Sequence, residues 1–101
     1  MTEICRISCV WNEEDIIKRN LEWYINQGFP TIILDNGSTD NTFNICKEYV
    51  GKGIVKLEQI PFKEHDRELS LKELNRIVRN TKFEWLLLAD ADEFYESPIK
   101  R

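Results

Sequence analysis

The chain has 101 residues, 42% hydrophobic and 32% charged, with a formal net charge of −4. This length predicts one domain, residues 1–101, and the composition excludes a disordered or membrane-embedded chain. Because no face rich in Lys and Arg is evident, we expect no nucleic-acid partner. We expect no transmembrane segment and no signal peptide. The cysteines are better explained as reduced thiols packed in the core than as ligands of a zinc site, so we expect a cytoplasmic protein.

The first predicted strand is the apolar stretch Ile4–Val10. A helix is expected after it, because apolar residues recur at helical spacing from Ile17 to Ile25. Asn12 is predicted to cap this helix, and Gly28 stands where a left-handed residue would end it.

The second strand is predicted at Thr31–Asp35, and a polar turn follows it. A second helix should begin after Thr39 or Asp40, either of which can cap it, and should end at the glycines of residues 51–53. The third strand is expected at Ile54–Ile60.

A loop containing Lys63, His65 and Arg67 should follow, and residues 70–73 form a capping box that predicts a third helix. The apolar run from residue 85 to residue 89 then predicts a fourth, buried strand. Strands that alternate with crossover helices favour an α/β fold: a Rossmann-like, mostly parallel sheet of about four strands with helices on both faces. The expected architecture is therefore three-layer α/β/α.

Ligands of open α/β sheets bind outside the carboxyl ends of the strands. Three of these ends are polar here, at residues 11–13, 35–38 and 90–93, and we expect them to meet at one edge. Asp90, Asp92 and Glu93 would repel one another without a cation, and hard oxygen ligands suit Mg²⁺ or Mn²⁺. Glycine-rich dinucleotide and P-loop motifs are absent, which disfavours those cofactors.

Three stretches resemble the signatures of glycosyltransferase family 2, in the branch of family-2-like transferases. They are VWNEE at residues 10–14, LDNGSTD at residues 34–40 and LADADEF at residues 88–94. The resemblance implies a GT-A fold whose N-terminal half binds a nucleoside-diphosphate sugar through a metal held by a D-x-D motif. The donor expected first is a UDP-sugar. It also implies transfer of a hexose to the hydroxyl of an unknown sugar or lipid-linked acceptor.

The resemblance assigns roles by position. It places Trp11 beside the base, and Glu13, Asp35 and Asn36 against base and ribose. Asp90 would contact the ribose or share the metal, and Asp92 would be its direct ligand. Asn36 stands where the family usually has a second acid, which leaves the base open. The acceptor-binding part and the general base are expected beyond Arg101, so no catalytic residue is assigned and the chain is expected to be incomplete as a catalyst.

Two other functions remain open from the residues alone. A strand ending in D-x-D also opens haloacid-dehalogenase-like phosphatases, with Asp90 as nucleophile, although Phe94 stands where that motif has Thr or Val. A non-catalytic nucleotide-binding domain would keep the same fold. For single residues the plainer alternatives are solvated loop acids at Asp90 and Asp92, and turn formation at residues 35–36. Trp23 and Trp85 are expected in the core.

Overall fold

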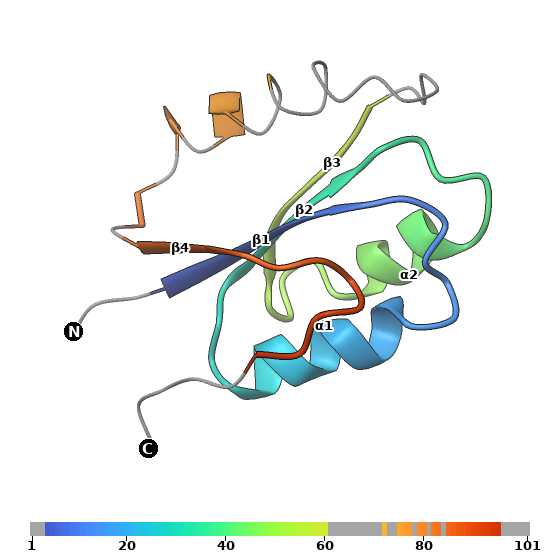
Figure 1. The fold of residues 1–101 in the computed structure, drawn as a ribbon, viewed down its shortest axis with the longest axis horizontal. Coiled ribbons are helices and arrows are strands. Elements are labelled where there is room, and N and C mark those ends of the chain that lie inside the picture. The colour runs from blue at the N-terminus through green and yellow to red at the C-terminus, as the bar shows by residue number, and fades with distance from the viewer. Residues whose placement is uncertain are drawn as a thin grey trace.

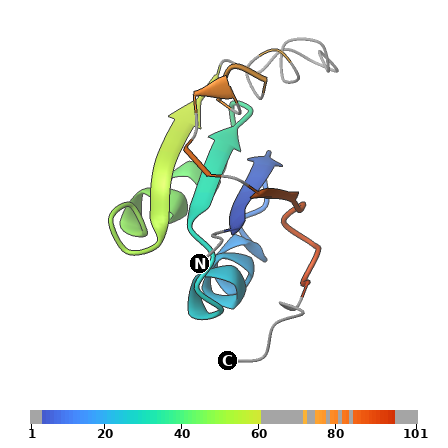
Figure 2. The ribbon, with the colours of Figure 1, turned by 90° about the vertical axis from the view of Figure 1, so that its left-hand side faces the viewer.

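The computed structural model describes residues 4–60, 72, 75–77, 79–80, 82–83 and 85–95. Its elements are β1 (Ile4–Val10), α1 (Ile17–Asn26), β2 (Thr31–Asp35), α2 (Thr42–Glu48), β3 (Ile54–Gln59) and β4 (Trp85–Leu88) (Figure 1). All strand pairs are parallel, and the strands lie in the order β3-β2-β1-β4 (Figure 2). The predicted parallel α/β sheet is confirmed.

Helices α1 and α2 cover one face of the sheet. The helical period puts Ile17 and Leu21 on one side of α1, and both are fully buried. They pack with Cys46 of α2 against Val10 and Ile33 of the sheet. This side chain layer fixes the distance between α1 and the strands that carry the site.

The opposite face of the sheet has its own apolar cluster. Cys5 and Ile7 of β1 lie there with Ile32 and Leu34 of β2, because side chains alternate along a strand. Ile77 packs on them from a stretch whose described residues, 72, 75–77 and 79, are helical. Layers on both faces agree with the expected three-layer architecture. The capping box at residues 70, 71 and 73 and the loop at residues 62–69 lie outside the described residues.

The strand order creates a point where the chain changes direction. From β1 the chain builds outward through β2 to β3, and it returns to place β4 on the other side of β1. Crossovers that leave on opposite sides open a crevice at the carboxyl ends of the strands, where open α/β sheets bind ligands. The loops that follow β1, β2 and β4 lie at this edge (Figure 1).

The helix starts differ from the prediction. Helix α1 begins at Ile17, its N-cap is Ile16, and no side chain caps it, so the prediction for Asn12 was wrong. Helix α2 has Asn41 as N-cap, also without a side-chain cap bond. Asp40 still accepts a hydrogen bond from the backbone N–H of Thr42 at 2.9 Å. The predicted stop at Gly28 is confirmed by its φ of 86°.

The prediction that residues 85–89 form a buried strand was wrong for most of the stretch. Trp85 is 62% exposed and Leu88 61% exposed, whereas Ala89 is buried. The physical reason is the position of β4, which is the outermost strand of the described sheet and pairs with β1. An apolar run predicts a strand, but its burial depends on what lies beside it.

Candidate functional site

The loop after β1 is joined to the loop after β2 by Asn12. This residue has a φ of 49°, a left-handed conformation that asparagine tolerates better than most residues. Its Oδ1 accepts hydrogen bonds from the N–H of Thr39 at 2.8 Å and of Asp40 at 3.3 Å. Its own N–H donates to Ser38 Oγ at 2.9 Å. Asn12 therefore does not cap a helix. It links two loops that carry candidate ligand contacts.

Asp40 adds further hydrogen bonds to the link between these two loops. Its carboxylate accepts from the backbone and side chain of Thr42 and from the N–H of Glu14. Burial alone would raise the pKa of Asp40, but these hydrogen bonds outweigh it and lower that pKa. The Asp40 carboxylate is thus engaged in organising the loop, although it is not the N-cap that was predicted for α2.

The loop after β4 closes on itself through Glu93. The N–H of Asp90 donates to Glu93 Oε1 at 2.8 Å, and the N–H of Glu93 returns a bond to the Asp90 carbonyl at 3.0 Å. Tyr95 donates its hydroxyl to Glu93 Oε2 at 2.7 Å. The bonds from Asp90 and Tyr95 lower the pKa of the Glu93 carboxyl. Glu93 therefore shapes this loop, residues 89–95, which contains Asp90 and Asp92 and is called the D-x-D loop.

Helix α1 anchors the same loop through hydrogen bonds from its side chains. The Tyr24 hydroxyl donates to the Glu93 carbonyl at 2.8 Å and accepts from the N–H of Tyr95 at 3.0 Å. The Asn20 amide donates to the Glu93 carbonyl at 2.8 Å, and Trp23 Nε1 donates to the Tyr95 carbonyl at 2.8 Å. Because these donors belong to a helix that is packed against the sheet, they fix the position of the loop backbone.

A buried arginine on β1 completes the anchor. Arg6 is 0% exposed, and its guanidinium donates to the Ala89 carbonyl from Nε at 3.3 Å and from Nη2 at 3.1 Å. Nη2 also contacts the Asp90 carbonyl at 3.4 Å and Asn20 Oδ1, and the guanidinium lies 4.4 Å from the centre of the Tyr24 ring. Burial lowers the pKa of Arg6 to about 10, so it remains protonated at neutral pH.

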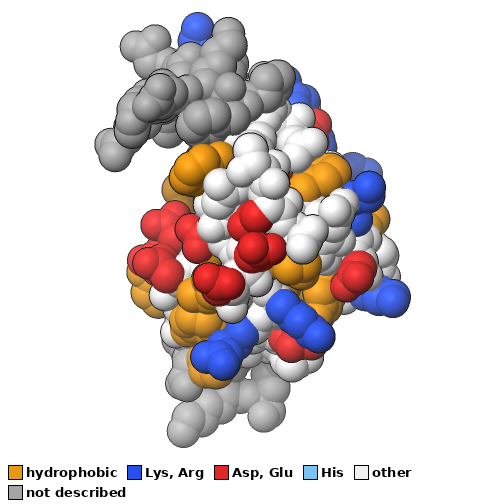
Figure 3. Space-filling model, turned by 90° about the vertical axis from the view of Figure 1, so that its right-hand side faces the viewer, with side chains coloured by type: hydrophobic (Ala, Val, Ile, Leu, Met, Phe, Trp, Pro, Cys, Tyr) orange, Lys and Arg blue, Asp and Glu red, His pale blue; other side chains and the backbone are white. Residues whose placement is uncertain are grey.

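Acidic side chains gather on the face that carries these loop ends (Figure 3). The pKa of Glu13 is raised, first by burial and then by the negative charges of Asp92, Asp40 and Asp90. These four carboxyls come from the loops after β1, β2 and β4, and they interact electrostatically. The expectation that the three polar strand ends meet at one edge is confirmed, because Glu13 interacts with Asp90 and Asp92 and the N–H of Asn12 donates to Ser38 Oγ.

Asp90 and Asp92 differ from Asp40 and Glu93, whose carboxylates accept hydrogen bonds within the protein. Asp90 and Asp92 are both exposed, and no hydrogen bond or ion pair joins either carboxylate to another residue in the described part of the chain. Among the described residues no three His, Cys, Asp or Glu side chains form a ready-made metal cage. Two free carboxylates with hard oxygen donors suit a cation such as Mg²⁺, which commonly takes one or two carboxylates and completes its shell with water and phosphate.

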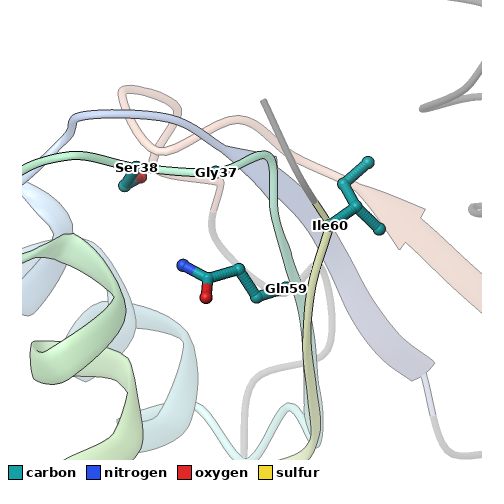
Figure 4. A pocket seen from close by; sticks show the side chains of 4 residues that line it. All are labelled: Gly37, Ser38, Gln59 and Ile60. Carbon is teal, nitrogen blue, oxygen red and sulfur yellow. The ribbon is translucent and has the colours of Figure 1, made fainter. Parts of the chain in front are cut away.

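A hollow of about 350 Å³ lies at the ends of β2 and β3, lined by Gly37, Ser38, Gln59 and Ile60 (Figure 4). The fully buried Asp35 holds two of the lining residues: its Oδ1 accepts from the N–H of Ser38 at 2.7 Å and from Gln59 Nε2 at 3.5 Å. Its Oδ2 is buried without a partner. A buried carboxylate oxygen without a donor is costly, and a donor that reached it would offset that cost.

The remaining predicted contacts are also at this edge. Trp11 follows β1 and is 43% exposed. Asn36 follows β2, is half-buried, and donates its N–H to the Val10 carbonyl at 2.8 Å. Trp85, expected in the core, is exposed, whereas Trp23 is partly buried.

The residues that hold the site together were not predicted from the sequence. Arg6, Asn20 and Tyr24 anchor the D-x-D loop, and Gln59 lines the hollow. One signal was available, because Arg6 is a lone charged residue within a strand otherwise made of apolar and small side chains. Buried arginines are rare and are paired when they occur. Its partners could not be named from the sequence, because Ala89 lies 83 positions away.

A parallel sheet with the order β3-β2-β1-β4 defines an open α/β domain, a class of fold that binds ligands at the carboxyl ends of its strands. The family model of glycosyl transferase family 2 matches residues 6–98, and the chain belongs to this family. No curated protein matches the chain. Within the part of the chain that the structure describes, no helix has the length and apolar character needed to cross a membrane.

Proposed function

We propose that this edge binds a nucleoside-diphosphate sugar together with a divalent cation, Mn²⁺ or Mg²⁺, for transfer of a hexose to an acceptor hydroxyl. The observation that carries the proposal is the pair of uncommitted carboxylates, Asp90 and Asp92, on a loop that is otherwise fully anchored. Family membership supports the transferase over a haloacid-dehalogenase-like phosphatase. None of the three cysteines forms a disulfide, which agrees with a reducing compartment such as the cytoplasm.

Asp92 is proposed as the direct ligand of the cation, and Asp90 as a second ligand or a ribose contact. Glu93 and Asp40 are less suited, because their carboxylates are engaged in hydrogen bonds within the protein. A bound cation would offset the charge of the departing nucleoside diphosphate. The diphosphate would in turn supply the ligands that the protein does not.

The base is proposed to lie at the hollow beside Ser38 and Gln59, with Asp35 as the acceptor for one of its N–H groups. Trp11 is exposed beside this edge and offers an aromatic surface for stacking. Glu13 and Asn36 are proposed to face base and ribose. Because Asn36 is an amide, it can both donate and accept, which suits more than one base.

In the proposed reaction the bond between the anomeric carbon and the phosphate oxygen breaks, and a bond to the acceptor oxygen forms. The acceptor hydroxyl loses its proton to a general base, and the electron pair of the broken bond leaves with the diphosphate. We propose that this general base and the acceptor site lie outside residues 1–101. The residues of this chain would therefore bind and orient the donor.

Calorimetric titration of the protein with uridine diphosphate and guanosine diphosphate, each with and without Mn²⁺, tests the proposal. We expect saturable binding of at least one of them in the presence of Mn²⁺, weakened by at least about tenfold when the cation is removed. Absence of binding by both nucleotides under both conditions would sink the proposal.

Asp35 gives a prediction about the base. In the Asp35→Asn variant Oδ1 can still accept from Ser38, but the charged acceptor is lost, so we expect uridine diphosphate to bind about tenfold more weakly. Titration of pyrophosphate with Mn²⁺ is the matched control, because it has the diphosphate and no base. Equal losses for both ligands would show that Asp35 does not contact the base.

Glu13 gives a prediction about pH. Because Asp92 and Asp90 help to raise its pKa, a cation bound between them should lower that pKa. Binding then releases a proton, and Mg²⁺ affinity rises as the pH rises through the window between the pKa of the complex and that of the free protein. An NMR titration of the Glu13 carboxyl carbon with and without Mg²⁺ measures this. A Glu13 pKa that Mg²⁺ leaves unchanged would place the cation elsewhere.

A further inference from the structure

The role of the buried Arg6 is not explained by the proposed donor contacts. Its guanidinium joins three parts of the molecule: strand β1, which carries it, helix α1 through Asn20 and Tyr24, and the D-x-D loop through the Ala89 and Asp90 carbonyls. It does not reach the surface, since Arg6 is 0% exposed. Any effect on a ligand must therefore pass through the loop.

Stability alone does not account for a cation at this place. Taking a guanidinium out of water is costly, and apolar residues of similar volume often replace buried charges without loss. Here the cost is met only in part, because Arg6 Nη1 has no hydrogen-bond partner. The compensating feature is the position of the charge, which lies close enough to Asp90 and Glu93 to interact with both electrostatically.

The direction of the hydrogen bonds shows what Arg6 does to the loop. Both carbonyls that it holds, those of Ala89 and Asp90, belong to the segment that leads into the D-x-D motif. A carbonyl held from below by a buried donor cannot turn outward without leaving a cation and an acceptor unpaired. The loop therefore has one favoured backbone conformation before a ligand arrives, which spares the cost of ordering it on binding.

We propose that Arg6 is a positioning residue that presets the D-x-D loop for the cation and diphosphate. This inference rests on the proposed function for its ligand, but the preset loop is a property of the free protein. Asn20 and Tyr24 would act with Arg6, because they hold the Glu93 carbonyl at the far end of the same loop.

The test compares Arg6→Met, which removes the charge and the donors at similar length, with Arg6→Lys, which keeps the charge and loses the planar fork. Amide hydrogen exchange, followed by NMR in the absence of ligand, reports on two bonds inside the loop: the N–H of Asp90 to Glu93 Oε1 and the N–H of Glu93 to the Asp90 carbonyl. We expect Arg6→Met to speed exchange at both amides by about tenfold or more, relative to amides of β2.

The same variants are titrated with uridine diphosphate and Mn²⁺. We expect Arg6→Met to bind about tenfold or more weakly, and Arg6→Lys to recover part of the loss and remain about threefold weaker than the wild type. Pyrophosphate with Mn²⁺ should show the same losses, because the loop holds the diphosphate and not the base. Arg19→Met, an exposed substitution on α1 with the same change of charge, should leave exchange and affinity unchanged.

Wild-type exchange at Asp90 and Glu93 in a folded Arg6→Met protein would overturn the proposal, as would wild-type affinity. If Arg6→Met does not fold, Arg6→Lys decides, and wild-type exchange and affinity in that variant would overturn it. The two proposals fail differently. If the wild type binds neither nucleotide, the proposed function falls, while the exchange measurement still decides whether Arg6 presets the loop.

Discussion

Replacing Asp92 by asparagine is expected to weaken the Mn²⁺-dependent binding of uridine diphosphate by about a hundredfold, or about 2.7 kcal/mol. The amide removes the negative charge and one of the two carboxylate oxygens, and Glu93 and Asp40 cannot take its place because their carboxylates are engaged. Calorimetric titration with Mn²⁺ measures the loss.

The same substitution should not destabilise the free protein, because it removes a negative charge that acts on Glu13. Thermal unfolding without ligand should therefore give an unchanged or slightly higher midpoint. Asp15→Asn, an exposed change of equal charge in the loop before α1, is the matched control and should bind normally. Full affinity in Asp92→Asn would remove Asp92 from the metal site.

Gly53→Ala is expected to reduce the free energy of unfolding by about 3 kcal/mol. Gly53 has a φ of 133°, and a Cβ there would lie 2.5 Å from Ile25 Cγ1 and 2.8 Å from Ile25 Cγ2. Both branches of the isoleucine are in the way, so no change at one end of the side chain relieves the contact. Urea denaturation followed by circular dichroism measures the loss.

Gly51→Ala is the matched comparison. Gly51 also has a positive φ, 81°, but a Cβ there would meet nothing within 4 Å. Only the backbone strain remains, and we expect a loss of about 1 kcal/mol. Equal losses at the two glycines would show that the contact with Ile25 relaxes at no cost.

The strands and their parallel arrangement were predictable because local pattern decides them. Apolar runs bounded by polar turns define β1 and β2 at the predicted limits, and crossover helices require parallel neighbours. The burial of β4 was not predictable in the same way. Leu88 is exposed because β4 ends the described sheet, and the position of a strand in a sheet is set by the whole topology.

The site was predictable to the level of which strand ends meet, but not to the level of what each side chain does. Asn12 was expected to cap the helix next to it, and it binds Thr39 instead, 27 positions along the chain. Glu93 belongs to the acidic motif, yet its carboxylate accepts from the N–H of Asp90. Asn12 finds its partners in another loop and Glu93 finds its partners within its own loop, so residue type and spacing alone did not predict either role.

In the proposed site, Asp92 and Asp90 hold a cation that binds the diphosphate of the donor. Crystals soaked with uridine diphosphate and Mn²⁺, measured for the anomalous signal of manganese, test it directly. We expect a manganese peak at coordination distance from the Asp92 carboxylate and from diphosphate oxygens, with the base at the hollow beside Ser38 and Gln59. Diphosphate density at this edge with no manganese beside Asp92, or a nucleotide bound elsewhere on the protein, would rule out this metal site.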